Sequence, residues 1–451
     1  MTQGPIRKQL ISFALPLFAG SLIQLLYNTV DLMFVGRVLG TEASAAVGAS
    51  SLIVTCILGA FTGLSVGVGV VTAKAVGSGN IGRLNQIIHC AAGLTCVLSL
   101  VFTVLGLIMA PEFLRWIQTP ADVLENATAY LRLYLLSLIS IVSYNMGSGI
   151  LRALGNTKSP TLYQLAGGIA NIIGNTLFIC FLDWGVQGAA LATACSQGLA
   201  AFLIIRHLCT IKTPYRLRLR QLQINASICG QFLLVGIPAA IQSIVITLSN
   251  LIVQAHINQL GIDSMAAFTA YFKVENFIYL PIMAFGQACS TFTSQNIGAN
   301  QVDRAKQGVK TSLFLGITVT ISASVLTLCF SDFAFGLFSK EPAVIALGTK
   351  IAFVAYPFYF IYVFLEVYAS AIRGAGKALP AMLIVVINMC VVRTCILKVV
   401  LHFYPNALGV AAIYPLTWAC TGLCLFLYYK SGGWFSAQTD VARKRISVGQ
   451  R

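Results

Sequence analysis

The sequence predicts an all-α protein that crosses a membrane many times. Hydrophobic residues make up 57% of its 451 residues, charged residues make up only 9%, and the mean hydropathy is +0.84. A soluble domain carries about 25% charged residues. Apolar runs near twenty residues long recur along the chain, and each is about long enough to cross the ~30 Å of bilayer hydrocarbon. The runs are continuous, whereas the strands of a membrane barrel alternate, so these runs are predicted to be helices.

Twelve membrane spans are predicted, in two sets of six. The first set covers residues 10–36, 47–73, 86–110, 127–150, 160–182 and 185–206, and the second covers 228–257, 264–292, 309–331, 345–371, 379–401 and 407–429. This order predicts an N-terminal six-helix lobe (1–206), a basic linker (207–227), a C-terminal six-helix lobe (228–430) and a basic tail (431–451).

The charges alternate between successive loops. Of the 29 Lys and Arg residues, 21 lie in the N-terminus, in the loops after even-numbered spans and in the C-terminus, whereas the opposite loops are mainly acidic. Because basic loops stay in the cytoplasm, both termini and the linker are predicted to be cytoplasmic, in the cell (cytoplasmic or inner) membrane. The net charge of +16 is spread over these loops and forms no single face, so we expect no nucleic-acid partner.

The two halves of the sequence repeat each other. Leu15-Pro16 matches Ile237-Pro238, Arg83 in the loop 77–86 matches Arg304 in the loop 298–307, and Arg152 matches Arg373. The offset is 221 or 222 residues throughout. Each set holds an even number of spans, so the halves share one orientation and form a parallel repeat, an arrangement found in transporters.

Several of these segments resemble the multidrug and toxic compound extrusion (MATE) family. The resemblance rests on span one from Pro16 to Arg37, the Gly-rich run 59–79, the segment Gln295 to Arg304, and the turns that begin at Arg152 and Arg373. It covers nearly the whole chain and is closer to the bacterial branch named for DNA-damage-inducible protein F than to the NorM type. It implies a secondary antiporter with two lobes and alternating access. Such a protein exports small, mostly cationic organic compounds in exchange for inward H⁺ or Na⁺ and needs no cofactor.

Span one carries the first candidate coupling site. Gln24, Asn28 and Asp31 fall at i, i+4 and i+7, which is one stripe of a helix and is expected to face the lobe interior. An acid within a membrane costs roughly 2.5–3.5 kcal/mol and is a functional candidate by default. Asn171 and Asn175 share a face of span five. We expect these five residues to bind a proton or Na⁺, or else Asp31 to be a structural hydrogen-bond acceptor.

The site departs from both branches of the family. The related branch carries an Asp where this chain has Asn175, and NorM-like members carry an acid in span seven, where this chain has Ile246. Coupling details therefore do not carry over from either branch.

The second candidate site lies in the C-terminal lobe. Lys273 and Glu275 lie in span eight, Glu366 in span ten and Arg393 in span eleven. Either acid could pair with Arg393 or Lys273. A fully paired cluster would be structural, whereas an acid without a partner would bind a cation or a proton. If Glu366 pairs with Arg393, Glu275 is the free carboxylate.

Aromatic residues are dense in spans eight and ten. Aromatic faces attract organic cations by roughly 0.5–2 kcal/mol per contact. Substrate-contact candidates are Tyr271, Tyr279, Tyr359 and Tyr362. The alternative is that these rings face lipid or the membrane interface.

Other functional classes find less support. No nucleophile or metal constellation indicates an enzyme, the His and Cys residues have no metal-ligand spacing, and no Walker motif indicates an ATP-driven pump. A lipid-linked oligosaccharide flippase with the same two-lobe plan remains the alternative, favoured by Lys273 and Arg393 but opposed by the inner acids. The expected partners are a small organic substrate and the bilayer, and the protein is expected to function as a monomer.

Overall fold

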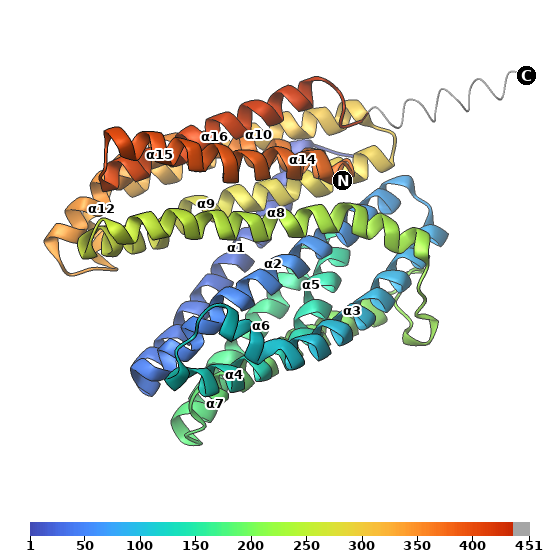
Figure 1. Ribbon diagram of the computed structural model, residues 1–451. Coiled ribbons are helices and arrows are strands. Elements are labelled where there is room, and N and C mark those ends of the chain that lie inside the picture. Colours follow the sequence, from blue (N-terminus) through green and yellow to red (C-terminus); the bar gives the residue numbers. More distant parts are fainter. Residues whose placement is uncertain (436–451) are drawn as a thin grey trace, which may run out of the picture. The chain divides into compact units, whose positions relative to one another are not determined.

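The structure is a computed structural model that describes residues 1–435, apart from the side chains of Leu32, Val35, Arg37 and residues 41–45. Within this range the protein is helical, with no strands, which confirms the predicted fold class (Figure 1). Most of the predicted tail 431–451 lies outside the described residues.

The helices of the first repeat follow the predicted spans closely. They are α1 (Ile6–Phe34), α2 (Gly40–Ser78), α3 (Ile81–Trp116), α4 (Ala121–Leu136), α5 (Leu138–Ala153), α6 (Lys158–Asn175) and α7 (Gly185–Thr210). Predicted span four is divided between α4 and α5, which meet at Ser137 at an angle of 43°. Two π-helical segments, η1 (Val35–Leu39) and η2 (Thr176–Phe181), extend α1 and α6.

The second repeat is divided into more pieces. Its helices are α8 (Ala226–Gln259), α9 (Ile262–Gly298), α10 (Val302–Cys329), α11 (Ser331–Gly336), α12 (Pro342–Ala355), α13 (Tyr359–Gly374), α14 (Ala378–Val386), α15 (Arg393–Phe403) and α16 (Ala407–Lys430). The 3₁₀ turn η4 (Tyr356–Phe358), which contains Pro357, joins α12 to α13, and the π-helical segment η5 (Ile387–Val392) joins α14 to α15. A further 3₁₀ turn, η3 (Leu219–Gln221), lies in the basic loop.

The predicted number of spans agrees with this architecture. In residues 1–435, ten helical segments are long and apolar enough to cross a membrane, and the bent pair α4–α5 makes an eleventh. The remaining predicted span, 264–292, lies within α9, which has 37 residues. This helix is long enough to cross a membrane, and it contains the polar residues Lys273, Glu275 and Asn276.

Packing divides the chain into two compact units. One unit contains residues 15–240, and the other contains residues 1–14 together with the described residues from 241 to 435. The start of α1 is therefore part of the second unit, and the start of α8 is part of the first. The predicted lobes 1–206 and 228–430 follow the sequence repeat, whereas these units follow the packing.

Equivalent hydrogen bonds hold the start of α8 in the first unit and the start of α1 in the second. In the first unit, Arg83 Nη2 donates to Gln231 Oε1 at 3.1 Å. In the second, Arg304 Nη2 donates to Gln9 Oε1 at 3.3 Å. Arg83 and Arg304 are related by the repeat offset, and so are Gln9 and Gln231. The internal repeat thus extends from sequence to individual side-chain contacts.

Helix α8 packs against α2 through glycines that leave no space for a side chain. A Cβ atom on Gly63 would lie 2.3 Å from the backbone nitrogen of Ala240, and one on Gly67 would lie 2.3 Å from the carbonyl oxygen of Phe232. Gly63 and Gly67 form a GxxxG pair, which allows close approach of membrane helices where the hydrophobic effect supplies no driving force between them.

This packing predicts a large difference between glycines of the same helix. Gly63→Ala or Gly67→Ala should destabilise the protein by about 1–3 kcal/mol, because backbone atoms cannot move aside as flexible side chains do. Gly48→Ala is the matched control, since a Cβ there meets nothing within 4 Å. It should be neutral or stabilising by about 0.5–1 kcal/mol. The melting temperature of purified protein in detergent measures both effects, and equal values for the three variants would contradict the packing argument.

Candidate functional site

Asp31 and the two predicted asparagines form one hydrogen-bonded chain in the first unit. Asn175 Nδ2 donates to Asp31 Oδ1 at 2.7 Å and to Asn171 Oδ1 at 3.2 Å. Asn171 Nδ2 in turn lies 3.4 Å from Thr193 Oγ1 on α7. Asn175 is fully buried and Asp31 is half-buried. Helices α1, α6 and α7 thus place one carboxylate and two amides in contact.

The other two residues of the predicted stripe, Gln24 and Asn28, take no part in these hydrogen bonds. Gln24 and Asn28 are exposed in the structure. Between them along α1, the Tyr27 hydroxyl is in hydrogen-bonding reach of Gln24, Gln164 and Gln197. Gln164 on α6, Gln197 on α7 and Thr193 were missed from the sequence. Glutamines within apolar spans are a signal that could have found the first two.

Buried Asn175 also has an unused acceptor. Its Oδ1 atom has no hydrogen-bond partner among residues 1–435. Buried amide oxygens are nearly always paired, so an orphan marks a place where a water, an ion or a ligand group is expected. The π-helical segment η2 begins at the next residue, and π-helical turns are frequent at functional sites.

In the second unit, Glu366 pairs with a residue of its own helix. Arg373 Nη2 lies 2.9 Å from Glu366 Oε1, and Ser370 Oγ donates to the same oxygen at 2.7 Å. Arg373 also donates to Ser370 Oγ at 2.8 Å and to Gln242 Oε1 at 3.4 Å. Glu366 therefore pairs with neither Arg393 nor Lys273, the two partners that the sequence had left open. Positions 366, 370 and 373 share one helix face, so the Arg373 side chain reaches back two turns to Glu366. The sequence had placed Arg373 in a loop, because it lies just after the end of the apolar run.

The remaining charged residues of the second candidate site have neutral partners. Lys273 is exposed, with its Nζ 5.5 Å from the centre of the Phe338 ring. Glu275 accepts a hydrogen bond from the Tyr359 hydroxyl. Arg393 Nη1 donates to Asn250 Oδ1 at 2.8 Å. In the part of the chain that the structure describes, no salt bridge involves Glu275 or Arg393.

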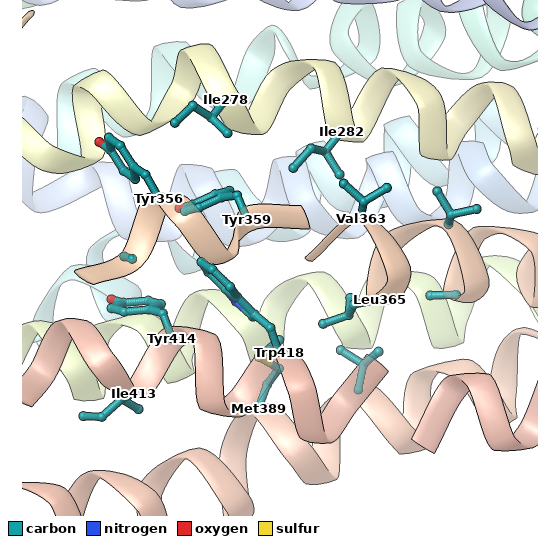
Figure 2. Packing of buried hydrophobic residues seen from close by; sticks show 14 of the residues in the cluster. Ile278, Ile282, Tyr356, Tyr359, Val363, Leu365, Met389, Ile413, Tyr414 and Trp418 are labelled. Atoms are coloured by element: carbon teal, nitrogen blue, oxygen red, sulfur yellow. The ribbon is translucent and has the colours of Figure 1, made fainter. Parts of the chain in front are cut away.

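Aromatic rings connect Glu275 with Arg393. Figure 2 shows Tyr356, Tyr359, Tyr414 and Trp418 packed together in the core of the second unit. The centres of the Tyr359 and Trp418 rings are 4.6 Å apart. The centres of the Trp418 and Tyr414 rings are 6.0 Å apart. Of the candidates, Tyr271 and Tyr359 are buried in this cluster, and Tyr362 contacts Trp418 at 5.4 Å and Tyr279 at 5.6 Å. Trp418 and Tyr414 were missed, although span twelve also carries Phe426, Tyr428 and Tyr429, because only spans eight and ten were expected to contribute aromatic rings.

Comparison with known proteins gives the family. The model of the family MatE matches residues 16–177 and 238–397, which is one segment from each repeat. The chain belongs to the MATE family. It is a membrane transporter and not an enzyme. The two matched segments begin at Pro16 and Pro238, the positions that open the two sequence repeats.

Relatives match over nearly the full length of the chain. The chain is 28% identical to the probable multidrug resistance protein YpnP of Bacillus subtilis, over 96% of this chain and 97% of that protein. It is 25% identical to an FAD transporter of Shewanella oneidensis over 86% of each. A crystal structure of MATE in the straight conformation aligns with a TM-score of 0.90 at 21% identity, covering 97% of this chain and 98% of that one. A MOP superfamily transporter from Pyrococcus furiosus aligns at 0.88 and 21%, over 95% and 96%.

The pairing of Glu366 predicts different effects for the two acids of the second unit. Glu366→Gln leaves Arg373 buried without a counter-charge, and breaking a buried pair costs about 3–5 kcal/mol, so yield and melting temperature should fall. Glu275→Gln breaks no salt bridge, so this variant should be obtained in normal yield. Glu112→Gln is the control, because Glu112 and Arg115 form an exposed pair worth about 1 kcal/mol or less. Equal stability of the Glu366 and Glu112 variants would contradict a structural role for the Glu366 pair.

Proposed function

We propose that this protein exports small, mostly cationic organic compounds by alternating access, in exchange for inward H⁺ or Na⁺. The contact between Asp31 and Asn175 is the observation that carries the proposal. It places a carboxylate among apolar helices with an amide donor and without a basic partner within salt-bridge distance in the described residues. Relatives named as multidrug resistance and multidrug export proteins support the export of drug-like compounds.

A lone carboxylate in this position is suited to exchange. Its charge is costly in a low dielectric, so it is stabilised by a proton, a metal cation or a cationic substrate. Where an inward ion and an outward cationic substrate compete for the same carboxylate, each releases the other. That competition is the chemical basis of antiport.

The orientation of Asn175 favours H⁺ over Na⁺ as the coupling ion. Its amide nitrogen faces Asp31, and its oxygen faces away from the carboxylate. A Na⁺ cage would use both oxygens as ligands, because such hard cations prefer oxygen. A proton needs only the carboxylate itself.

Glu275 is the best candidate for a second proton or cation site. It accepts a hydrogen bond from Tyr359 and has no basic side chain within salt-bridge distance in the described residues, whereas Glu366 is neutralised by Arg373. The flippase alternative is not favoured, because a pyrophosphate group would be repelled by the unneutralised acids Asp31 and Glu275.

The coupling proposal is tested by Asp31→Asn in liposomes. The substitution keeps the size of the side chain and removes its exchangeable charge, so yield should be normal while gradient-driven transport of the cationic dye rhodamine 123 falls to background. Imposing the H⁺ and Na⁺ gradients separately identifies the ion, and H⁺ alone should drive the wild type. Asp122→Asn, at an exposed acid in the first turn of α4, should transport normally. Normal transport by Asp31→Asn would make Asp31 a structural residue.

We also propose that both termini and the loop 207–227 are cytoplasmic, in the inner or cytoplasmic membrane, and that the monomer is the working unit. Gln223→Cys and Ala121→Cys lie at exposed positions in loops predicted to be on opposite sides. In a background whose native cysteines are replaced, an impermeant maleimide added to intact cells should label only the Ala121 variant. Labelling of the Gln223 variant alone would reverse the orientation.

A further inference from the structure

Two cysteines from distant parts of the sequence bring their sulfur atoms into contact in the first unit. Cys90 Sγ on α3 and Cys229 Sγ on α8 are 3.4 Å apart, although 139 positions separate the residues. All 13 cysteines lie among residues 1–435, and this is the one sulfur–sulfur contact that the structure describes among them. Both residues are buried. Their spacing in the sequence gave no sign of this pairing.

The cysteine pair lies where the linker 207–227 rests on α3. Asn85 Nδ2 donates to the carbonyl oxygen of Pro214 at 3.0 Å, and the backbone N–H of Arg218 donates to His89 Nε2 at 3.0 Å. Asn85 and His89 are four positions apart, so they share one face of α3. The first turns of α3 therefore hold the linker by hydrogen bonds, and Cys90 follows directly after His89.

The same contact region continues into the start of α8. The backbone N–H of Asn225, the residue before this helix, donates to Cys90 Sγ at 3.5 Å, and Cys229 follows in the first turn of α8. Ser227 and Gly230, on either side of Cys229, are exposed. Cys229 itself keeps 8% of its surface exposed. The two thiols therefore lie just beneath the surface, where a molecule as small as hydrogen peroxide can reach them.

Two thiols in contact are suited to form a disulfide. The sulfur atoms are 3.4 Å apart and must approach to about 2 Å, a gap of the size that side-chain rotation closes. A peroxide oxidises one thiol to a sulfenic acid and is itself reduced to water, and the second thiol then attacks the sulfenic sulfur and expels another water. Two thiols and one hydrogen peroxide thus give one disulfide and two waters. The reaction needs no cavity, because no atom is added to the pair.

We infer that Cys90 and Cys229 are a modification site, a dithiol that peroxides close to a disulfide and that thiol reductants reopen. The disulfide fastens the linker and the start of α8 to α3, which hydrogen bonds hold together in the reduced protein. The pair lies on the side proposed to be cytoplasmic, where the disulfides that form are usually transient and redox-sensing. The inference is independent of the proposed export function.

Oxidation of the purified full-length protein in detergent tests the inference. After treatment with hydrogen peroxide and alkylation of the remaining thiols, mass spectrometry of proteolytic peptides should find Cys90 joined to Cys229, and dithiothreitol should reverse the link. The disulfide joins residues 139 positions apart, so it should raise the melting temperature by about 5 °C. Cys90→Ser and Cys229→Ser should show no such rise. Cys289→Ser, which removes the third buried cysteine, is the matched control and should respond like the wild type.

Several results would overturn the inference. Cys90 and Cys229 that stay alkylatable while exposed cysteines are oxidised would show that the pair is only a packing contact. Oxidation that stops at separate sulfinic acids, or a disulfide between other cysteines, would have the same meaning. An oxidised wild type with the Cys90–Cys229 link but an unchanged melting temperature would show that the link does not fasten α8 to α3. If the Ser variants fail to fold, the peptide map of the wild type before and after dithiothreitol is sufficient to decide.

Discussion

The absence of water from the bilayer interior is the constraint on which this structure depends. Each backbone or side-chain polar group in a span must find its partner within the protein. Two buried hydroxyl groups of α16 follow this rule locally: Thr417 and Thr421 donate to the carbonyl oxygens of Ile413 and Thr417, each at 2.7 Å. Helix contacts obey the same constraint, because packing without a hydrophobic driving force requires close approach. The glycines of α2 against α8 provide that approach.

The two repeats share a scaffold but differ in their polar chemistry. Asp31 of α1 has Val253 at the offset of 222 residues, so α8 carries no carboxylate at the equivalent place. Conversely, Glu366, which neutralises Arg373, has Asn145 at the offset of 221, so Arg152 has no equivalent acid. The first unit therefore combines a carboxylate with amides, and the second combines an acid and an arginine with aromatic rings. The repeat fixes where helices lie, and these single substitutions give each unit its own set of polar groups.

Hydropathy predicted where the spans lie, with helix ends that differ by up to seven residues, because a span is defined by length and apolarity alone. The grouping of Asn171 with Asn175 also followed from helical spacing, and their contact with Asp31 agrees with the predicted grouping. Interaction partners that are reached only through a long side chain could not be predicted from helical spacing. Arg373 was assigned to a loop because the apolar run ends before it, yet its long side chain returns to Glu366. Trp418 is one of five aromatic residues in span twelve, and only the packing of α13 on α16 brings it to Tyr359.

A polar group in such a protein either completes the fold or remains available for a ligand, and hydrogen-bond satisfaction distinguishes the two. Glu366 receives hydrogen bonds from Ser370 and Arg373, and it fits against Gly286, where a Cβ would lie 2.7 Å from its Oε1. A group so fully satisfied gains little from an ion. Asn175 Oδ1 and Arg393 Nε are buried without partners, and Glu275 has a single neutral donor. Each is next to a helix irregularity or an aromatic cluster: η2 follows Asn175, η5 precedes Arg393, and Tyr359 begins α13 after η4. Local departures from regular helix geometry change the direction of side chains that a regular helix would pair. We therefore propose that Asn175, Glu275 and Arg393 are places where an ion or a substrate contributes the missing interaction.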